Sequence, residues 1–227
     1  MVQGISLSAS DFLWELKFNN EKPWFLAHKD EFERLVNQPM KALLRETVAL
    51  MNERWPETEF QGHVSRIYRD ARRTFGRGPY KDHLWISIHA ADVGRHGPGF
   101  WFELGPGRYS YGMGWYEVTP GMMEQFRQSI AAQPARFAAL AEGIARHSRF
   151  RYYGEEYRRP KGDYGEAVNR WYNRKEIGCG VERDLDTAGL SAELPALLRD
   201  EFALLMPMYD YLREFYHRVG DPTEEQF

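Results

Sequence analysis

The spacing of apolar residues divides the chain into a helical beginning, a middle of strands and a helical end. In the first 55 residues apolar side chains recur every three or four positions, which predicts amphipathic helices. Three are expected: one that opens at Ser8 or Ser10 and stops at Asn19-Asn20, one with Pro23 in its first turn, and one that begins at Pro39 and ends before Trp55-Pro56.

From residue 63 the period changes to two, which is typical of strands. Strands are expected at residues 63–69, 84–89, 100–104 and 109–118. Pairing Ile88 with Phe102 and Ile86 with Leu104 would place these four apolar side chains on one face. The opposite face would then carry aromatic and ionisable groups, namely Trp85, Ser87, His89, Trp101 and Glu103.

Helical spacing returns at residues 121–130, after Pro134, and over 194–219, whereas residues 151–170 are expected to form an ordered loop. Helices, then a strand meander, then helices indicate an α+β fold. We expect N-terminal helices, a central antiparallel sheet of about four or more strands, and C-terminal helices, in a single domain spanning residues 1–227. Strands and helices do not alternate, which excludes Rossmann and TIM-barrel architectures.

Composition favours a soluble globular protein, because 43% of the residues are hydrophobic and 28% are charged. The first ten residues lack a signal-peptide pattern and no run of 18 apolar residues occurs, so a cytoplasmic location away from membranes is expected. The one cysteine, Cys179, excludes an intrachain disulfide and a cysteine-based zinc site; between two glycines it is expected to fill a tight turn. The histidines show no metal-ligand spacing, so neither a metal nor a cofactor is expected.

Positive charge is concentrated in two segments, residues 66–83 and 158–175, which each carry a net charge of +4. The chain as a whole has a net charge of −3, so its other residues carry −11. An acidic body of this kind would repel duplex DNA, whereas a local basic concavity would accept a small anion.

The first basic segment reads Arg66-Ile67-Tyr68-Arg69-Asp70, continues with Arg72 and closes with Pro79-Tyr80-Lys81. Guanidinium groups bind carboxylates and phosphates through two parallel hydrogen bonds. The expected ligand contacts are Arg66, Arg69, Arg72 and Lys81. Asp70 would orient a guanidinium, and Tyr80 or Glu103 would supply hydrogen bonding or proton transfer. These three are the candidate catalytic residues. Alternatively, Arg66 or Arg69 forms a structural ion pair with Asp70 or Glu103.

The second basic segment contributes Lys161 and Lys175, which we expect to close the same site. Lys161 precedes a glycine, as in phosphate-binding loops, but no Walker pattern surrounds it. A solvated basic loop is the alternative. Convergence of the two segments on one cleft is therefore the central expectation.

Several stretches together resemble a family of conserved hypothetical proteins of bacteria and fungi, the domain of unknown function 2461. The matching stretches are Phe12-Leu13 with Leu16, Trp24-Phe25, the run Arg66 to Arg72 with Pro79-Tyr80-Lys81, Phe102-Glu103, Gly112-Met113-Gly114, and Pro160-Lys161-Gly162 with Lys175. The sequence departs from the family pattern at Arg73, at Phe75 and at Gly76-Arg77. The resemblance implies a soluble α+β domain and supplies no reaction.

Three hypotheses follow from the sequence. The first is a cleft for a small phosphorylated or carboxylated ligand. The second is a non-enzymatic domain that docks an acidic partner or RNA through an open basic surface. In the third, the arginines only brace the sheet. The pattern does not decide whether the protein is an enzyme, and it does not indicate an oligomeric state.

Overall fold

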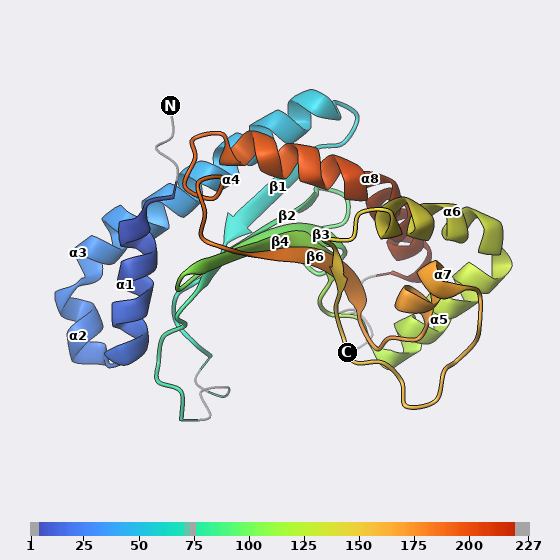
Figure 1. The fold of residues 1–227 in the computed structure, drawn as a ribbon, viewed down its shortest axis with the longest axis horizontal. Coiled ribbons are helices and arrows are strands. Elements are labelled where there is room, and N and C mark those ends of the chain that lie inside the picture. Colours follow the sequence, from blue (N-terminus) through green and yellow to red (C-terminus); the bar gives the residue numbers. More distant parts are fainter. Residues whose placement is uncertain (1–4, 71, 73–75, 221–227) are drawn as a thin grey trace. The chain divides into compact units, whose positions relative to one another are not determined.

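The structure, a computed structural model, describes residues 5–70, 72 and 76–220. It has the expected α+β fold, with N-terminal helices, a six-stranded antiparallel sheet and the C-terminal helix α8 (Figure 1). The helices are α1 (Leu7–Phe18), α2 (Lys22–Ala27), α3 (Lys29–Phe32), η1 (Glu33–Asn37), α4 (Gln38–Arg54), α5 (Pro120–Ala132), α6 (Pro134–Ala145), α7 (Glu166–Tyr172) and α8 (Leu194–Val219). The strands are β1 (Phe60–Val64), β2 (Leu84–Ala90), β3 (Gly99–Gly105), β4 (Arg108–Trp115), β5 (Arg151–Tyr152) and β6 (Ile177–Asp184).

The first helix begins earlier than its sequence predicted. Ser6 has extended backbone angles, and its hydroxyl accepts a hydrogen bond from the Ala9 N–H at 3.3 Å. Ser6 is therefore the N-cap, and Ser8 and Ser10 lie inside the helix. The helix ends at Asn19, close to the predicted stop.

The second predicted helix is divided into three pieces, α2, α3 and η1, that lead directly into α4. The break lies at His28, where the backbone leaves helical geometry and the ring Nδ1 bonds to the Trp24 carbonyl at 2.8 Å. Residues 33–37 form a π-helical turn. Pro39 lies in the first turn of α4, where proline is tolerated because the first N–H groups of a helix have no partner within it.

The sheet has the strand order β1-β2-β3-β4-β6-β5, so β1 and β5 are its edges. The four predicted strands are present with shifted ends; the first is the most displaced, since β1 ends at Val64. Strands β5 and β6 were not predicted, and they pair antiparallel, with Arg151 opposite Gly180 and Tyr152 opposite Cys179.

Burial alternates along β2 and β3 as the two-residue period predicted. Ile86, Ile88, Phe102 and Leu104 are fully buried. Trp85, Ser87, Trp101 and Glu103 are half-buried, so they lie on the other face. His89, which the pattern placed with them, is only 6% exposed.

Glycines allow β4 and β6 to approach closely. A Cβ on Gly112 would lie 2.2 Å from the Cys179 carbonyl oxygen and 2.6 Å from the Cα of Gly180. Cys179 itself is completely buried in the middle of β6, so the expected tight turn is wrong. The flanking glycines serve strand packing instead, and burial raises the pKa of the Cys179 thiol.

The helical end of the chain matches its pattern closely. Thr119 caps α5 by accepting a hydrogen bond from the Met122 N–H at 3.2 Å. Helix α8 has the predicted bounds and contains Pro207. Residues 151–170, predicted as a loop, contribute β5 and the beginning of α7.

The chain packs as two compact units. Unit 1 consists of residues 1–88, 101–111 and 182–199, and unit 2 consists of residues 89–100, 112–181 and 200–227. The single domain expected from the sequence stays a prediction. The first basic segment belongs to unit 1 and the second to unit 2, and the two are described separately below.

Candidate functional site

In unit 1, residues 67–69 pair with residues 79–81 as two short antiparallel stretches. The Arg69 N–H donates to the Pro79 carbonyl at 2.8 Å, and the Lys81 N–H donates to the Ile67 carbonyl at 2.8 Å. Tyr68 and Tyr80 lie opposite each other between these bonds. The pairing explains how Arg69 and Lys81, twelve positions apart in the sequence, reach neighbouring places.

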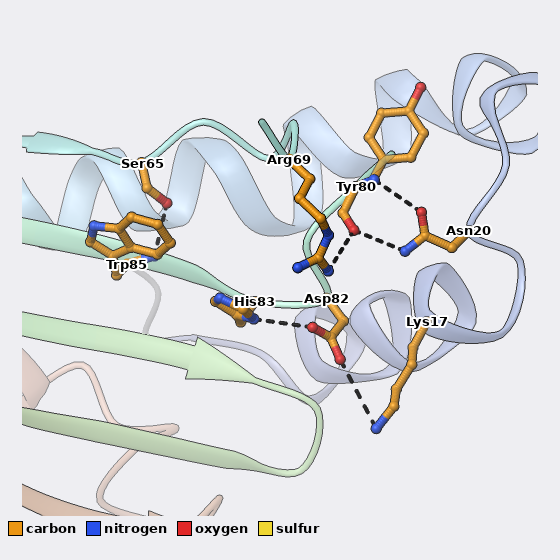
Figure 2. A network of polar contacts seen from close by, with 8 residues as sticks. All are labelled: Lys17, Asn20, Ser65, Arg69, Tyr80, Asp82, His83 and Trp85. Atoms are coloured by element: carbon orange, nitrogen blue, oxygen red, sulfur yellow. Dashed lines mark hydrogen bonds and ion pairs between the residues drawn. The ribbon is translucent and has the colours of Figure 1, made fainter. Parts of the chain in front are cut away.

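Asn20, directly after α1, holds this pairing in place (Figure 2). Its Nδ2 donates to the Tyr80 carbonyl at 2.9 Å, and its Oδ1 accepts from the Tyr80 N–H at 3.0 Å. Gly78 allows this approach, because it has a φ of +80° and a Cβ there would lie 2.6 Å from the Asn20 Oδ1. Residues 78–80, just before β2, are thereby fixed to the end of the first helix.

The Tyr80 ring belongs to the core of unit 1. It is 2% exposed and stacks on Phe25, with 4.1 Å between the ring centroids. Burial, followed by the neighbouring Tyr68, raises the pKa of the Tyr80 phenol. In Figure 2 the ring points away from the Arg69 guanidinium. Proton transfer by Tyr80 stays a prediction, and the observed contacts are those of a packing residue.

Arg69 and Lys81 form the cationic centre of the site. An Arg69 Nη2 donates to the Tyr80 carbonyl at 3.1 Å, while its Nε is buried and has no hydrogen-bond partner among the described residues. The Lys81 Nζ lies 3.8 Å from the centroid of the Trp85 ring. Partial burial, and then the charge of Arg69, lower the pKa of Lys81 to about 8, against the opposing effect of Glu103.

Two acidic residues, Asp82 and Glu103, lie beside this centre. Asp82 Oδ1 is 3.0 Å from His83 Nδ1, and Asp82 Oδ2 is 4.0 Å from Lys17 Nζ (Figure 2). Burial alone would raise the pKa of Asp82, but its hydrogen bonds to His83 and the backbone and the charges of His83 and Lys17 lower it overall. Asp82 is therefore an ionised, partnered carboxylate.

Glu103 differs from Asp82 in its electrostatics. Burial raises the pKa of Glu103, and the charges of Asp82 and Glu182 add to the rise, while His83 and Arg108 oppose it. Glu103 therefore retains a proton more readily than an ordinary glutamate. Lys81 has a lowered pKa, and Glu103, whose charge acts on Lys81, has a raised one. Shifted pKa values of this kind are common at functional sites.

The other cations of this segment are exposed. The Arg72 side chain is 88% exposed, and it donates from Nε and Nη2 to the two oxygens of Asp70 at 3.1 and 2.8 Å. Asp70 therefore orients a guanidinium, that of Arg72. Arg66 is exposed and makes no ion pair with a described residue. Arg73 and Phe75 lie outside the described residues.

The predicted residues of the second segment lie in unit 2. The Lys175 Nζ bonds to Glu155 Oε2 at 2.6 Å, and this contact raises the pKa of Lys175. The backbone N–H of Lys161 donates to Asn173 Oδ1 at 2.7 Å, and its Nζ lies 5.0 Å from the centroid of the Tyr157 ring. Convergence of the two basic segments stays a prediction.

The family comparison agrees with the resemblance seen in the sequence. The model of the conserved hypothetical protein family DUF2461 matches residues 8–211, which is most of the chain. The chain belongs to the DUF2461 family. A search of the curated proteins finds no match. In this DUF2461 protein the match includes every residue of the Arg69–Lys81 site, from Lys17 to Glu182.

Two parts of the DUF2461 site were missed by reasoning from the sequence. Asn20 was interpreted as the end of a helix and not as a site residue, and Trp85 as part of a mixed aromatic and ionisable face. The available signal for Trp85 was its place on the same β2 face as Ser87, next to the end of a basic segment. For Asn20 no local signal exists, because its partner Tyr80 is 60 positions away.

The described residues contain neither a metal-binding cluster nor a membrane-spanning helix. Within residues 5–70, 72 and 76–220, no group of three or more His, Cys, Asp or Glu side chains is placed to hold a metal ion. Over the same ranges, the helices are all too short or too polar to cross a membrane.

Proposed function

We propose that unit 1 binds a small anionic ligand, phosphorylated or carboxylated, at Arg69 and Lys81. The observation that carries the proposal is the state of these two cations. The buried Nε of Arg69 lacks a hydrogen-bond partner among the described residues, and Lys81 makes no ion pair within the same set. A buried N–H donor without an acceptor costs about 1–3 kcal/mol, which an anion oxygen would recover.

Electrostatics support the same ligand chemistry. Partial burial and then the charge of Arg69 lower the pKa of Lys81, so the two cations disfavour each other's charge. Burial raises the pKa of the acidic neighbour, Glu103, so its charged form is disfavoured there. An anion placed against both cations would relieve their repulsion and raise the pKa of Lys81. Binding would therefore take up protons near pH 8 and weaken as the pH rises above 8.

The proposal uses unit 1 alone. Arg66, exposed on the neighbouring stretch, is a further cation for a larger ligand. Lys175 is already paired with Glu155, so its part in the same ligand site rests on the sequence expectation only. Arg72 is paired with Asp70, so its part in the ligand site likewise rests on the sequence expectation only. No reaction is part of the proposal.

One observation favours a second candidate, an open surface that docks an acidic protein or RNA. Arg66 and Arg72 are exposed to solvent, as that hypothesis requires. The third hypothesis, arginine as a brace, draws support from the Arg69 bond to the Tyr80 carbonyl. The three predict different responses to single substitutions, because Arg69 and Arg72 carry the same charge in different surroundings.

The test compares Arg69→Gln with Arg72→Gln by thermal shift and calorimetry in a phosphate-free buffer. The anions added in turn are phosphate, nucleotides, sugar phosphates and citrate. The two variants lose equal charge from one segment, so Arg72→Gln is the matched control. We expect an anion to stabilise the wild type and Arg72→Gln, and Arg69→Gln to bind it at least about tenfold more weakly.

Three results would contradict the proposal. If no anion stabilises the wild type more than Arg69→Gln, no such site exists. If Arg72→Gln weakens binding as much as Arg69→Gln, the charge acts as a diffuse surface. If Arg69→Gln unfolds, Lys81→Met takes its place, and unchanged anion binding by that variant refutes the site.

A further inference from the structure

A hollow of about 340 Å³ lies between α4 and the edge strand β1, within unit 1 and apart from the Arg69–Lys81 site. It is lined by Lys41, Leu44, Arg45 and Val48 of α4 and by Gly62 and Val64 of β1. The helical residues recur at spacings of three and four, so they form one stripe along the helix facing the strand. A groove between a helix and the edge of a sheet is therefore present.

The hydrogen bonds of β1 show which backbone groups face this edge. The Phe60 N–H donates to Asn52 Oδ1 at 2.7 Å, and the Asn52 Nδ2 donates to the Phe60 carbonyl at 3.1 Å. On the other side, the N–H of Ser65 donates to the carbonyl of Trp85 in β2 at 2.8 Å. Backbone groups of a strand alternate between its two sides. The even-numbered residues Gly62 and Val64 therefore direct their N–H and C=O groups to the free edge.

Asn52 makes the bonds that a residue of a seventh strand would make. Its side-chain amide supplies one donor and one acceptor to Phe60, as a paired backbone residue does. Because β1 is an edge of the sheet and its backbone groups alternate, the groups of Gly62 and Val64 on this side face none of the described strands. Both of these residues line the hollow, so the open part of the ladder and the groove coincide.

We propose that this groove binds an extended, acidic segment of another protein, which adds to β1 as a strand. Its backbone would pair with Gly62 and Val64, and one side chain would enter the hollow against Leu44 and Val48. Lys41 and Arg45 are exposed and make no ion pair within the described part of the chain. These two cations would pair with carboxylates of the incoming segment, which sets its charge.

The same charges argue against a second copy of this chain as the occupant. If the β1 edges of two copies paired, Lys41 and Arg45 of one copy would lie near Lys41 and Arg45 of the other. Like charges at an interface disfavour association. An acidic segment removes this conflict, so the charge pattern favours a different protein over self-association.

The test uses an array of blocked pentapeptides that alternate glutamate with an apolar residue, such as Glu-Val-Glu-Val-Glu, beside counterparts with lysine for glutamate. Binding is measured by fluorescence anisotropy, and exchange of the Gly62 and Val64 amides by hydrogen–deuterium exchange. We expect the acidic members to bind at least about tenfold more tightly than the lysine members and to slow exchange at both amides.

Two protein variants and one peptide variant locate the site. Val64→Pro removes an N–H that faces the free edge, a position where a strand tolerates proline. The double variant Lys41→Glu, Arg45→Glu reverses the flanking charge, and Lys29→Glu, Arg34→Glu is its matched control, since these cations are also exposed in unit 1. Should Val64→Pro fail to fold, peptides N-methylated at the pairing positions replace it. Peptide binding should be at least about tenfold weaker for Val64→Pro, for the charge-reversed double variant and for the N-methylated peptides. The control variant should bind like the wild type.

The proposal is overturned if no acidic peptide binds more tightly than its lysine counterpart, or if backbone N-methylation leaves binding unchanged. Protection of Gly62 and Val64 that grows with protein concentration alone would identify a second copy as the occupant and would equally overturn it. The proposals of a peptide site and of an anion site can be refuted independently. Arg69→Gln should leave peptide binding unchanged, because Arg69 does not line the hollow.

Discussion

Replacing Lys81 with methionine removes an ammonium group that its surroundings disfavour. Partial burial and the charge of Arg69 lower its pKa from 10.5 to about 8. A change of this size corresponds to about 3.4 kcal/mol against the charged form in the folded protein. The side chain is half-buried, so solvent screening reduces the penalty to about 1–2 kcal/mol.

The contact with Trp85 acts in the opposite direction. The ammonium lies 3.8 Å from the ring centroid, and a cation–π contact of this kind contributes about 0.5–1 kcal/mol. Methionine loses this contact but retains much of the apolar packing on the ring. The expected net effect of Lys81→Met is a gain of about 0.5–1 kcal/mol in the free energy of unfolding at pH 7.

The pH dependence gives the sign of the effect independently. Between about pH 8 and 10.5 the unfolded chain binds a proton at Lys81 that the folded chain has released. The wild type therefore gains stability from this group as the pH rises through that window, and the penalty is fully present below pH 8. Lys81→Met lacks the effect, so its advantage over the wild type should shrink across the window.

Urea unfolding of both proteins at pH 7, 8, 9 and 10 measures this difference. Lys41→Met, which removes an exposed lysine of the same unit, controls for the general effect of losing one charge. A Lys81→Met variant less stable than the wild type at pH 7 would refute the reasoning. So would a stability difference that stays constant from pH 7 to pH 10.

Two further predictions concern hydrogen bonds that a single substitution removes. Asn20→Ala loses both hydrogen bonds to the Tyr80 backbone and should lower the free energy of unfolding, measured in urea, by about 1–3 kcal/mol. Asn19→Ala is the control and should cost less, because the Asn19 amide bonds to its own helix at an exposed site. Equal losses in the two variants would contradict the bracing role of Asn20. Tyr209→Phe leaves the buried Ala90 N–H without its 2.8 Å acceptor and should cost about 1–3 kcal/mol by the same measurement, whereas a loss below about 0.5 kcal/mol would contradict it.

Patterns that depend on neighbouring residues were readable from the sequence. The alternation along β2 and β3 identified the buried face correctly, because the two-residue period of a half-buried strand is visible in its own residues. The bounds of α8 were predicted for the same reason, since a long apolar stripe overrides Pro207. Local periodicity was sufficient for both.

Elements stabilised by distant contacts were missed. Strand β6 carries Gly178 and Gly180, which have low strand propensity and indicated a turn around Cys179. Their place in a strand depends on β4, because Gly112 lies so close that a Cβ would meet the Cys179 carbonyl. No pattern within β6 contains this information. The break at His28 was also not predicted. There the ring bonds to the Trp24 carbonyl and the helix does not continue regularly.

The candidate site shows how far a count of charges can reach. Six cations between residues 66 and 83 predicted an anion site but treated Arg69 and Arg72 alike. The structure distinguishes them by their partners, because Arg72 is paired with Asp70 in solvent, while the buried Nε of Arg69 has no hydrogen-bond partner among the described residues. That difference arises from the pairing of residues 67–69 with 79–81, which Asn20 holds from the end of α1. A cation becomes available to a ligand through the contacts it does not make, and those depend on the tertiary fold.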